Sequence, residues 1–89
     1  MIIELNKFGS ILISRPAGKE ALLAAKAYLL PPATEKEMII DFSGVNVLAP
    51  SWADEFITGL IEMYGKGKIK YRNSDNSSVK ETLKIINAN

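Results

Sequence analysis

The chain has 89 residues, of which 47% are hydrophobic and 24% are charged, and its 11 basic and 10 acidic side chains give a net charge of +1. These values are typical of one small globular domain covering residues 1–89, and they argue against disorder. Because the sequence contains neither cysteine nor histidine, it excludes disulfides, thiolate metal sites, cysteine nucleophiles and Ser-His catalytic pairs, and we expect a non-enzymatic binding or regulatory module without a cofactor.

The first half of the chain predicts two short strands and a helix. Ile2–Leu5 and Ser10–Ser14 have the composition of strands, and the turn between them, which contains asparagine and glycine, indicates a β-hairpin. Pro16 suits the first turn of a helix. This helix ends before the proline pair at 31–32, and the residues up to Lys36 form a short connection. Its predicted apolar stripe consists of Ala17, Ala21, Ala24, Ala25 and Tyr28.

The second half alternates strands and helices. The apolar run Met38–Phe42 is typical of a strand that is buried on both faces. Ser51–Tyr64 predicts a long helix with a clear apolar stripe. Lys68–Arg72 alternates cationic and apolar side chains, as a strand does, and Val79–Ile86 predicts a last helix that begins with a capping box at Ser78. The stripe of the long helix consists of Ala53, Phe56, Ile57, Leu60, Ile61 and Tyr64.

The order β-β-α-β-α-β-α predicts an α/β fold, in which helices pack on a small mixed four-stranded sheet. No apolar stretch reaches the roughly 20 residues that cross a bilayer. The N-terminus also lacks the basic and apolar regions of a secretion signal. We therefore expect a single-domain cytoplasmic protein.

The loop that leads from the buried strand into the long helix is the main candidate site. Helix N-termini carry free N–H groups and the positive end of the helix dipole, which favour anions. Ser51 stands at this position, and Asp54 follows three residues later. The Ser51 hydroxyl would serve as an N-cap that accepts from the Asp54 N–H, as a phosphorylation site that gains about −1.5 to −2 charges, or as both.

Trp52 is the only tryptophan, and it lies off the apolar stripe of its helix. Partly exposed tryptophans anchor protein interfaces, although this side chain would equally close over the loop as peripheral core. We therefore predict a surface that binds a protein partner. Its residues are Asn46, Ala49, Pro50, Ser51, Trp52 and Glu55.

The last quarter of the chain is basic, because residues 65–89 contain six basic and two acidic side chains. One alternative function is therefore a nucleic-acid or nucleotide-binding module, although lysines on a strand more commonly protect a sheet edge. Another alternative is a small enzyme that uses Asp41 and Asp54, but the sequence predicts no metal site. The basic patch would comprise Lys66, Lys68, Lys70 and Arg72.

The stretch from Ile39 to Leu60 resembles the centre of a STAS domain, the module shared by sulfate transporters and anti-sigma factor antagonists. The matching features are a hydrophobic strand that runs into residues 40–45, a loop, and a serine at the start of a long helix. More specifically, the chain resembles a bacterial STAS-like family of unknown function. The residues that carry this resemblance are Phe8–Ser10, Ser14-Arg15, Asp41–Val45, Ser51–Glu55 and Ile69–Asn73.

The resemblance implies a STAS-like fold and a regulatory role. In anti-sigma factor antagonists, a partner kinase phosphorylates a serine in this loop, which releases that partner, and Ser51 matches this serine. The chain departs from those proteins at three neighbouring positions. Ala49 replaces their acidic residue, Pro50 replaces the first serine-like residue, and Trp52 replaces the glycine that follows the serine. The resemblance therefore implies a partner-binding surface more directly than phosphorylation. The implied partner is a protein, with a serine kinase or ATPase of the anti-sigma type as the candidate, and the oligomeric state is left open.

Overall fold

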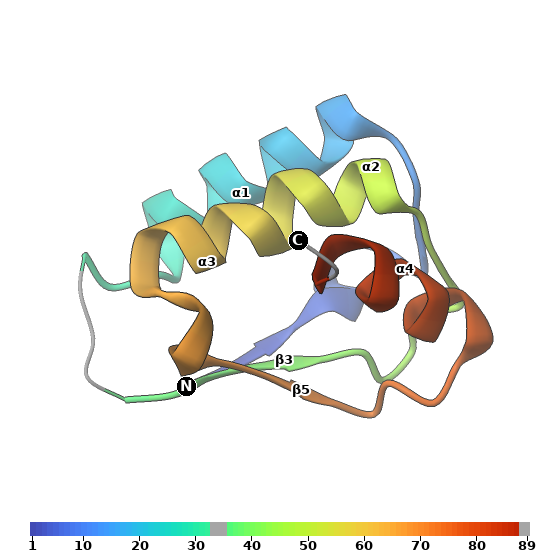
Figure 1. Cartoon of the computed structure of the whole chain (residues 1–89). Coiled ribbons are helices and arrows are strands. Elements are labelled where there is room, and N and C mark those ends of the chain that lie inside the picture. The colour runs from blue at the N-terminus through green and yellow to red at the C-terminus, as the bar shows by residue number, and fades with distance from the viewer. Residues whose placement is uncertain (33–35, 88–89) are drawn as a thin grey trace.

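The computed structural model describes residues 1–32 and 36–87, so the middle of the predicted connection before Lys36 lies outside the described residues. Strands and helices follow one another in the predicted order, with one additional short strand at Val47–Leu48 (Figure 1). The strands are β1 (Ile2–Glu4), β2 (Ile11–Leu12), β3 (Met38–Asp41), β4 (Val47–Leu48) and β5 (Ile69–Arg72). The helices are α1 (Arg15–Tyr28), α2 (Pro50–Ala53), α3 (Gly59–Tyr64) and α4 (Ser77–Asn87), with short 3-10 turns at Leu5–Phe8 and Lys66–Lys68.

The main sheet has the order β1-β3-β5, and both strand pairs are parallel. Met38 and Ile40 of β3 are fully buried beneath the helices, which all lie on one side of this sheet (Figure 1). The predicted burial of β3 on both faces is therefore wrong. Because side chains alternate along a strand, Ile39 points to the opposite side, and it is only half-buried. None of the described helices lies on that side (Figure 1).

The predicted hairpin is also wrong. After β1, the 3-10 turn Leu5–Phe8 buries Leu5 and leads the chain away from the main sheet. β2 then pairs in parallel with β4, with Ile11 opposite Val47. In place of a mixed four-stranded sheet, the described residues form a parallel three-stranded sheet and a separate parallel ribbon of β2 and β4.

Helix α1 begins where the sequence predicts, and Ser14 caps it by accepting a hydrogen bond of 3.2 Å from the Ala17 N–H. Its buried face, however, differs from the predicted alanine stripe. Tyr28 is 86% exposed, and Ala17 and Ala24 are exposed as well. Ala21 and Ala25 of the predicted stripe are buried, and Gly18 completes the buried face.

The predicted helix Ser51–Tyr64 is confirmed almost to its ends. α2, a π-helical turn at Asp54–Thr58, and α3 form one continuous helix from Pro50 to Tyr64, which we call helix 50–64 (Figure 1). It ends at Gly65, whose φ of 94° suits glycine. Its predicted stripe is buried except for half-buried Ile61, with Ala53, Phe56, Ile57, Leu60 and Tyr64 in the core.

Helix α4 starts two residues earlier than predicted, so the capping box at Ser78 is wrong. Asn76 caps the helix instead, because its side-chain oxygen accepts from the Ser78 N–H at 2.7 Å and from the Val79 N–H at 3.2 Å. Val79 and Thr82 are its buried residues. No helix among the described residues is long and apolar enough to cross a membrane.

Candidate protein-interaction surface

The predicted loop site lies at the ribbon of β2 and β4, where backbone hydrogen bonds fix it from one side. The Ser10 carbonyl accepts from the Asn46 N–H at 2.8 Å and from the Val47 N–H at 3.1 Å. The Ala49 N–H donates to the Leu12 carbonyl at 2.8 Å. Residues 46–49 are therefore held against β2.

Helix α4 holds the same loop from the other side. The Ser78 hydroxyl accepts from the Leu48 N–H at 3.0 Å, and the Thr82 hydroxyl donates to the Leu48 carbonyl. The Asn76 side chain donates to the Asn46 carbonyl at 2.9 Å. Because both edges of β4 are hydrogen-bonded, the loop is anchored to β2 on one side and to α4 on the other.

The outer face of the ribbon is apolar and exposed. Leu12 and Leu48 point inward and are fully buried. Since side chains alternate along a strand, the neighbouring residues Ile11, Ile13 and Val47 point outward, and they are 60%, 54% and 38% exposed. We call these three residues, together with the adjoining Ala49 and Pro50, the ribbon patch. Three large apolar side chains gathered on one strand pair differ from the scattered apolar residues of an ordinary surface.

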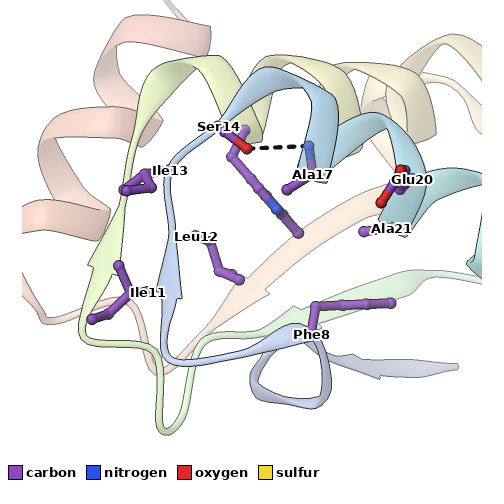
Figure 2. A pocket seen from close by; sticks show the side chains of 9 residues that line it. Phe8, Ile11, Leu12, Ile13, Ser14, Ala17, Glu20 and Ala21 are labelled. Atoms are coloured by element: carbon purple, nitrogen blue, oxygen red, sulfur yellow. Dashed lines mark hydrogen bonds between the residues drawn. The ribbon is translucent and has the colours of Figure 1, made fainter.

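A groove runs along β2 on the side away from β4 (Figure 2). It has a volume of about 400 Å³, and α1 forms its opposite wall with Ala17, Glu20 and Ala21. Leu12 and Phe8 both line it (Figure 2). The groove thus continues the apolar surface around the edge of β2.

Trp52 lies against this groove, but it is only 1% exposed, so of its two predicted roles the core residue is confirmed and the partly exposed anchor is wrong. Its ring stacks on Phe56 with centroids 5.0 Å apart, and Phe8 packs 6.2 Å from it. Helix 50–64 therefore has a second buried side besides its apolar stripe. This side packs against α1 and against the 3-10 turn that carries Phe8. Trp52 is therefore a core residue that supports the groove from beneath.

Ser51 does not cap its helix, contrary to one of the two predictions. The cap position is Ala49, and Pro50 is the first helical residue, which places Ser51 one step inside the helix. Ser51 is half-buried. Among residues 1–32 and 36–87, none forms a hydrogen bond with its hydroxyl, and the phosphorylation hypothesis stays a prediction.

The acidic residues that follow Ser51 bind Arg15 at the start of α1. Its Nη1 lies 2.8 Å from Asp54 Oδ2 and 3.1 Å from Glu55 Oε1. The hydrogen bond from Arg15 lowers the pKa of Asp54 below its ordinary value, and the same two carboxylates raise the pKa of Arg15. Glu55, which the sequence assigned to the partner surface, is thus engaged with α1.

The predicted basic patch lies on edge strand β5 and the turn before it. Arg72 pairs with Asp41 at 3.1 Å, and Lys70 pairs with Glu37 at 3.8 Å. Lys66 and Lys68 lie in the 3-10 turn, where Lys66 is exposed and Lys68 half-buried. Two of the four cations therefore already have carboxylate partners.

Asp41 and Asp54, the pair considered for catalysis, belong to separate clusters. Asp41 binds Arg72 and Asn73 at the end of the main sheet, whereas Asp54 binds Arg15. In the part of the chain that the structure describes, no group of three acidic residues could hold a metal ion.

Sequence reasoning missed the ribbon patch on β2 and the role of Arg15. The run Ser10–Ser14 carries three consecutive apolar residues between serines. This pattern indicates a strand that is apolar on both faces, of which the core covers only one. The assumed hairpin obscured this signal, because it placed β2 inside the main sheet. No local pattern marks Arg15, since its partners lie about forty residues away.

One family model matches the chain, over residues 26–79, and it describes a STAS-like domain of unknown function (DUF4325). The matched segment contains β3, β4, helix 50–64 and β5. It therefore includes the loop and Ser51. No curated protein and no solved structure gives a significant match.

Proposed function

The chain belongs to the family of STAS-like domains of unknown function, and on that premise we propose that it is a non-enzymatic regulatory module of the cytoplasm that binds a protein partner through the ribbon patch. The single observation that carries this proposal is the exposure of Ile11, Ile13 and Val47 on a ribbon whose loop is fixed from both sides. The groove beside β2 offers the partner a second apolar contact.

The energetic reason is that contiguous exposed apolar surface is costly in water and is relieved when a partner covers it. Interfaces gain most of their stability from a few central apolar side chains. The hydrogen bonds that anchor the loop add to this, because they hold it in one conformation before the partner binds and so reduce the conformational entropy lost on binding. These features favour a protein partner over a small ligand.

The experiment compares two isoleucines of equal exposure on different faces. Ile13 in the ribbon patch and Ile85 on α4 are both 54% exposed. The tagged chain is expressed in its native cells, and the proteins that copurify are identified by mass spectrometry. We expect Ile13→Glu to lose the main copurifying protein and Ile85→Glu to retain it. Equal retention by both variants would contradict the ribbon patch as the binding surface.

We further propose that phosphorylation of Ser51 switches this binding, with a serine kinase of the anti-sigma type as the partner. The Ser51 Oγ would form the new P–O bond, the bond between the γ-phosphorus and the bridging oxygen of the kinase's ATP would break, ADP would leave, and the hydroxyl proton would pass to the kinase's base. Support comes from the position of Ser51, which lies beside the ribbon patch with a hydroxyl that caps nothing. A phosphate there would add about −1.5 to −2 charges next to an apolar surface.

The switch is tested with two substitutions at one position. We expect Ser51→Asp to bind the copurified partner about tenfold more weakly than Ser51→Ala, because the added charge opposes burial of the patch. Binding is measured with purified proteins by calorimetry. If the two variants bind equally, the switch is wrong, while the outcome with Ile13→Glu still decides the binding surface.

A further inference from the structure

Ser51, Asp54 and Glu55 share one face of helix 50–64. Residues three and four positions apart on a helix lie next to each other, so Ser51 stands one turn before both carboxylates. Side chains on a helix also tilt toward its N-terminus, which brings Asp54 and Glu55 toward Ser51. The three residues therefore form one cluster at the start of the helix.

Helix α1 lies directly over this cluster. At Gly18 the two helices approach so closely that an added methyl group would come 2.6 Å from the Trp52 carbonyl oxygen and 3.2 Å from Glu55 Cβ. The two helices run in the same direction (Figure 1), so Arg15, one turn before Gly18, lies toward the start of helix 50–64. Its guanidinium contacts both carboxylates through a single nitrogen, Nη1.

The ion pairs of Arg15 are accessible to solvent. The side chains of Arg15 and Asp54 are about half exposed, at 51% and 50%, and that of Glu55 is 28% exposed. Exposed pairs of this kind contribute little to stability, because water competes with both partners. A phosphate attracts a guanidinium more strongly, since it carries more charge and offers oxygens that match the guanidinium fork.

We propose that Arg15 releases Asp54 and Glu55 and binds the phosphate of phosphorylated Ser51. This inference rests on the proposed phosphorylation of Ser51. In the unmodified chain the two carboxylates occupy Arg15. In the modified chain the phosphate takes their place, and both carboxylates turn toward solvent. The modification thereby changes which groups link the start of α1 to the start of helix 50–64.

The test measures the phosphate directly and needs no partner. Phosphoserine is incorporated at position 51 during expression, and the ³¹P resonance is followed against pH. A nearby cation favours the dianion, whereas Asp54 and Glu55 oppose it. We expect the second phosphate pKa in the otherwise unchanged chain to lie about half a unit or more below that in Arg15→Gln.

The matched control is Lys26→Gln, which removes one positive charge from the last turn of the same helix. This variant should keep the pKa of the unsubstituted chain, and Arg15→Lys should recover only part of the Arg15→Gln effect, because an ammonium lacks the guanidinium fork. Equal phosphate pKa values in Arg15→Gln and Lys26→Gln would overturn the proposal.

A second measurement avoids substitution altogether. The ¹⁵N resonances of the Arg15 guanidinium should move when Ser51 is phosphorylated in the unsubstituted chain, and unchanged resonances would contradict the inference. Both readouts are independent of partner binding. If phosphorylation leaves partner binding unaffected while Arg15 still responds to the phosphate, the proposed switch fails and this inference stands.

Discussion

Asp41 shows how one buried carboxylate joins the ends of two neighbouring strands. Its oxygens accept from the Ser43 N–H at 2.9 Å, from the Asn73 side chain at 2.9 Å and from Arg72 at 3.1 Å. Asn73 has a φ of 58°, a left-handed conformation that asparagine tolerates better than most residues. The hydrogen bonds from Asn73 and Ser43, followed by that from Arg72, lower the pKa of Asp41 below its ordinary value.

A lowered pKa makes the stability of the chain depend on pH. The folded state favours the carboxylate, so the stabilisation by Asp41 is fully present above its ordinary pKa of about 3.9. It is lost as the pH falls from there through the pKa of the folded state. We expect the urea midpoint to fall over this acidic range, and to fall less steeply in Asp41→Asn. Identical profiles for the two proteins would contradict this role of Asp41.

Asp54 contributes to the same acidic range, because Arg15 lowers its pKa too. We therefore expect the urea midpoint of Asp41→Asn still to fall with pH in this range. Adding Asp54→Asn to that variant should reduce the fall further. The two carboxylates lie in separate clusters, so their effects should be additive.

Single residues at the candidate site were harder to predict than the elements around it. The predicted helix start lies within one residue of the observed one, but that residue decides the cap, because the helix begins at Pro50 and Ser51 is already inside it. Caps depend on where the backbone first turns, and a shift of one residue changes their identity. The apolar stripe alone left the burial of Trp52 open, because it marks only one of the two sides on which helix 50–64 is packed.

At the scale of elements, α1 and helix 50–64 pack at two glycines. A methyl group at Gly18 would meet the backbone of Trp52 at 2.6 Å, whereas one at Gly59 would meet only the end of the Leu22 side chain at 2.5 Å. A backbone cannot move without moving its helix, but a leucine can change rotamer. Gly18 therefore sets the distance between the helices, whereas a side chain at Gly59 could be accommodated by a different rotamer of Leu22.

This difference predicts unequal effects of the same substitution. Glycine to alanine in an exposed helix stabilises by about 1 kcal/mol. We expect Gly18→Ala instead to destabilise the chain by about 1–3 kcal/mol, because the helices must separate, and Gly59→Ala to cost clearly less. Urea unfolding measures both, and a Gly18→Ala protein as stable as the unsubstituted one would show that α1 is not held at this distance.

The elements themselves were mostly predictable, but their pairing was not. Helix 50–64 and β5 follow from local periodicity, which depends only on neighbouring residues. The hairpin failed because β1 and β2 are close in sequence and satisfy the usual preference for pairing neighbours. That preference was overridden by the 3-10 turn at Leu5–Phe8, which no apolar pattern marks.

For the whole molecule, the two sheets differ in how firmly they are held. β3 is bonded on both edges and lies beneath all the helices. The ribbon has only two residues in each strand. Local stability follows buried contacts and bonded neighbours, so the candidate interaction surface lies on the less stable part of the fold.

Amide hydrogen exchange should reveal this order. We expect the amides of Ile39 and Ile40 to exchange most slowly, and those of Leu12 and Val47 to exchange considerably faster. The measurement is two-dimensional NMR after transfer into deuterated water. Ribbon amides as slow as those of β3 would indicate one cooperative unit, contrary to the separation of the two sheets.

The exclusively parallel pairing of the described strands has a consequence for how the chain folds. Ile2 pairs with Ile39, and Met38 pairs with Ile69, so each pair closes only after an intervening helix has been made. During synthesis on the ribosome, β1 has no strand to join until β3 emerges, and β3 keeps one edge open until β5 follows. Long-range pairings of this kind place folding toward the slow end for a domain of this size. Early in synthesis, therefore, helices are the only regular structure that the emerging part of this chain can form.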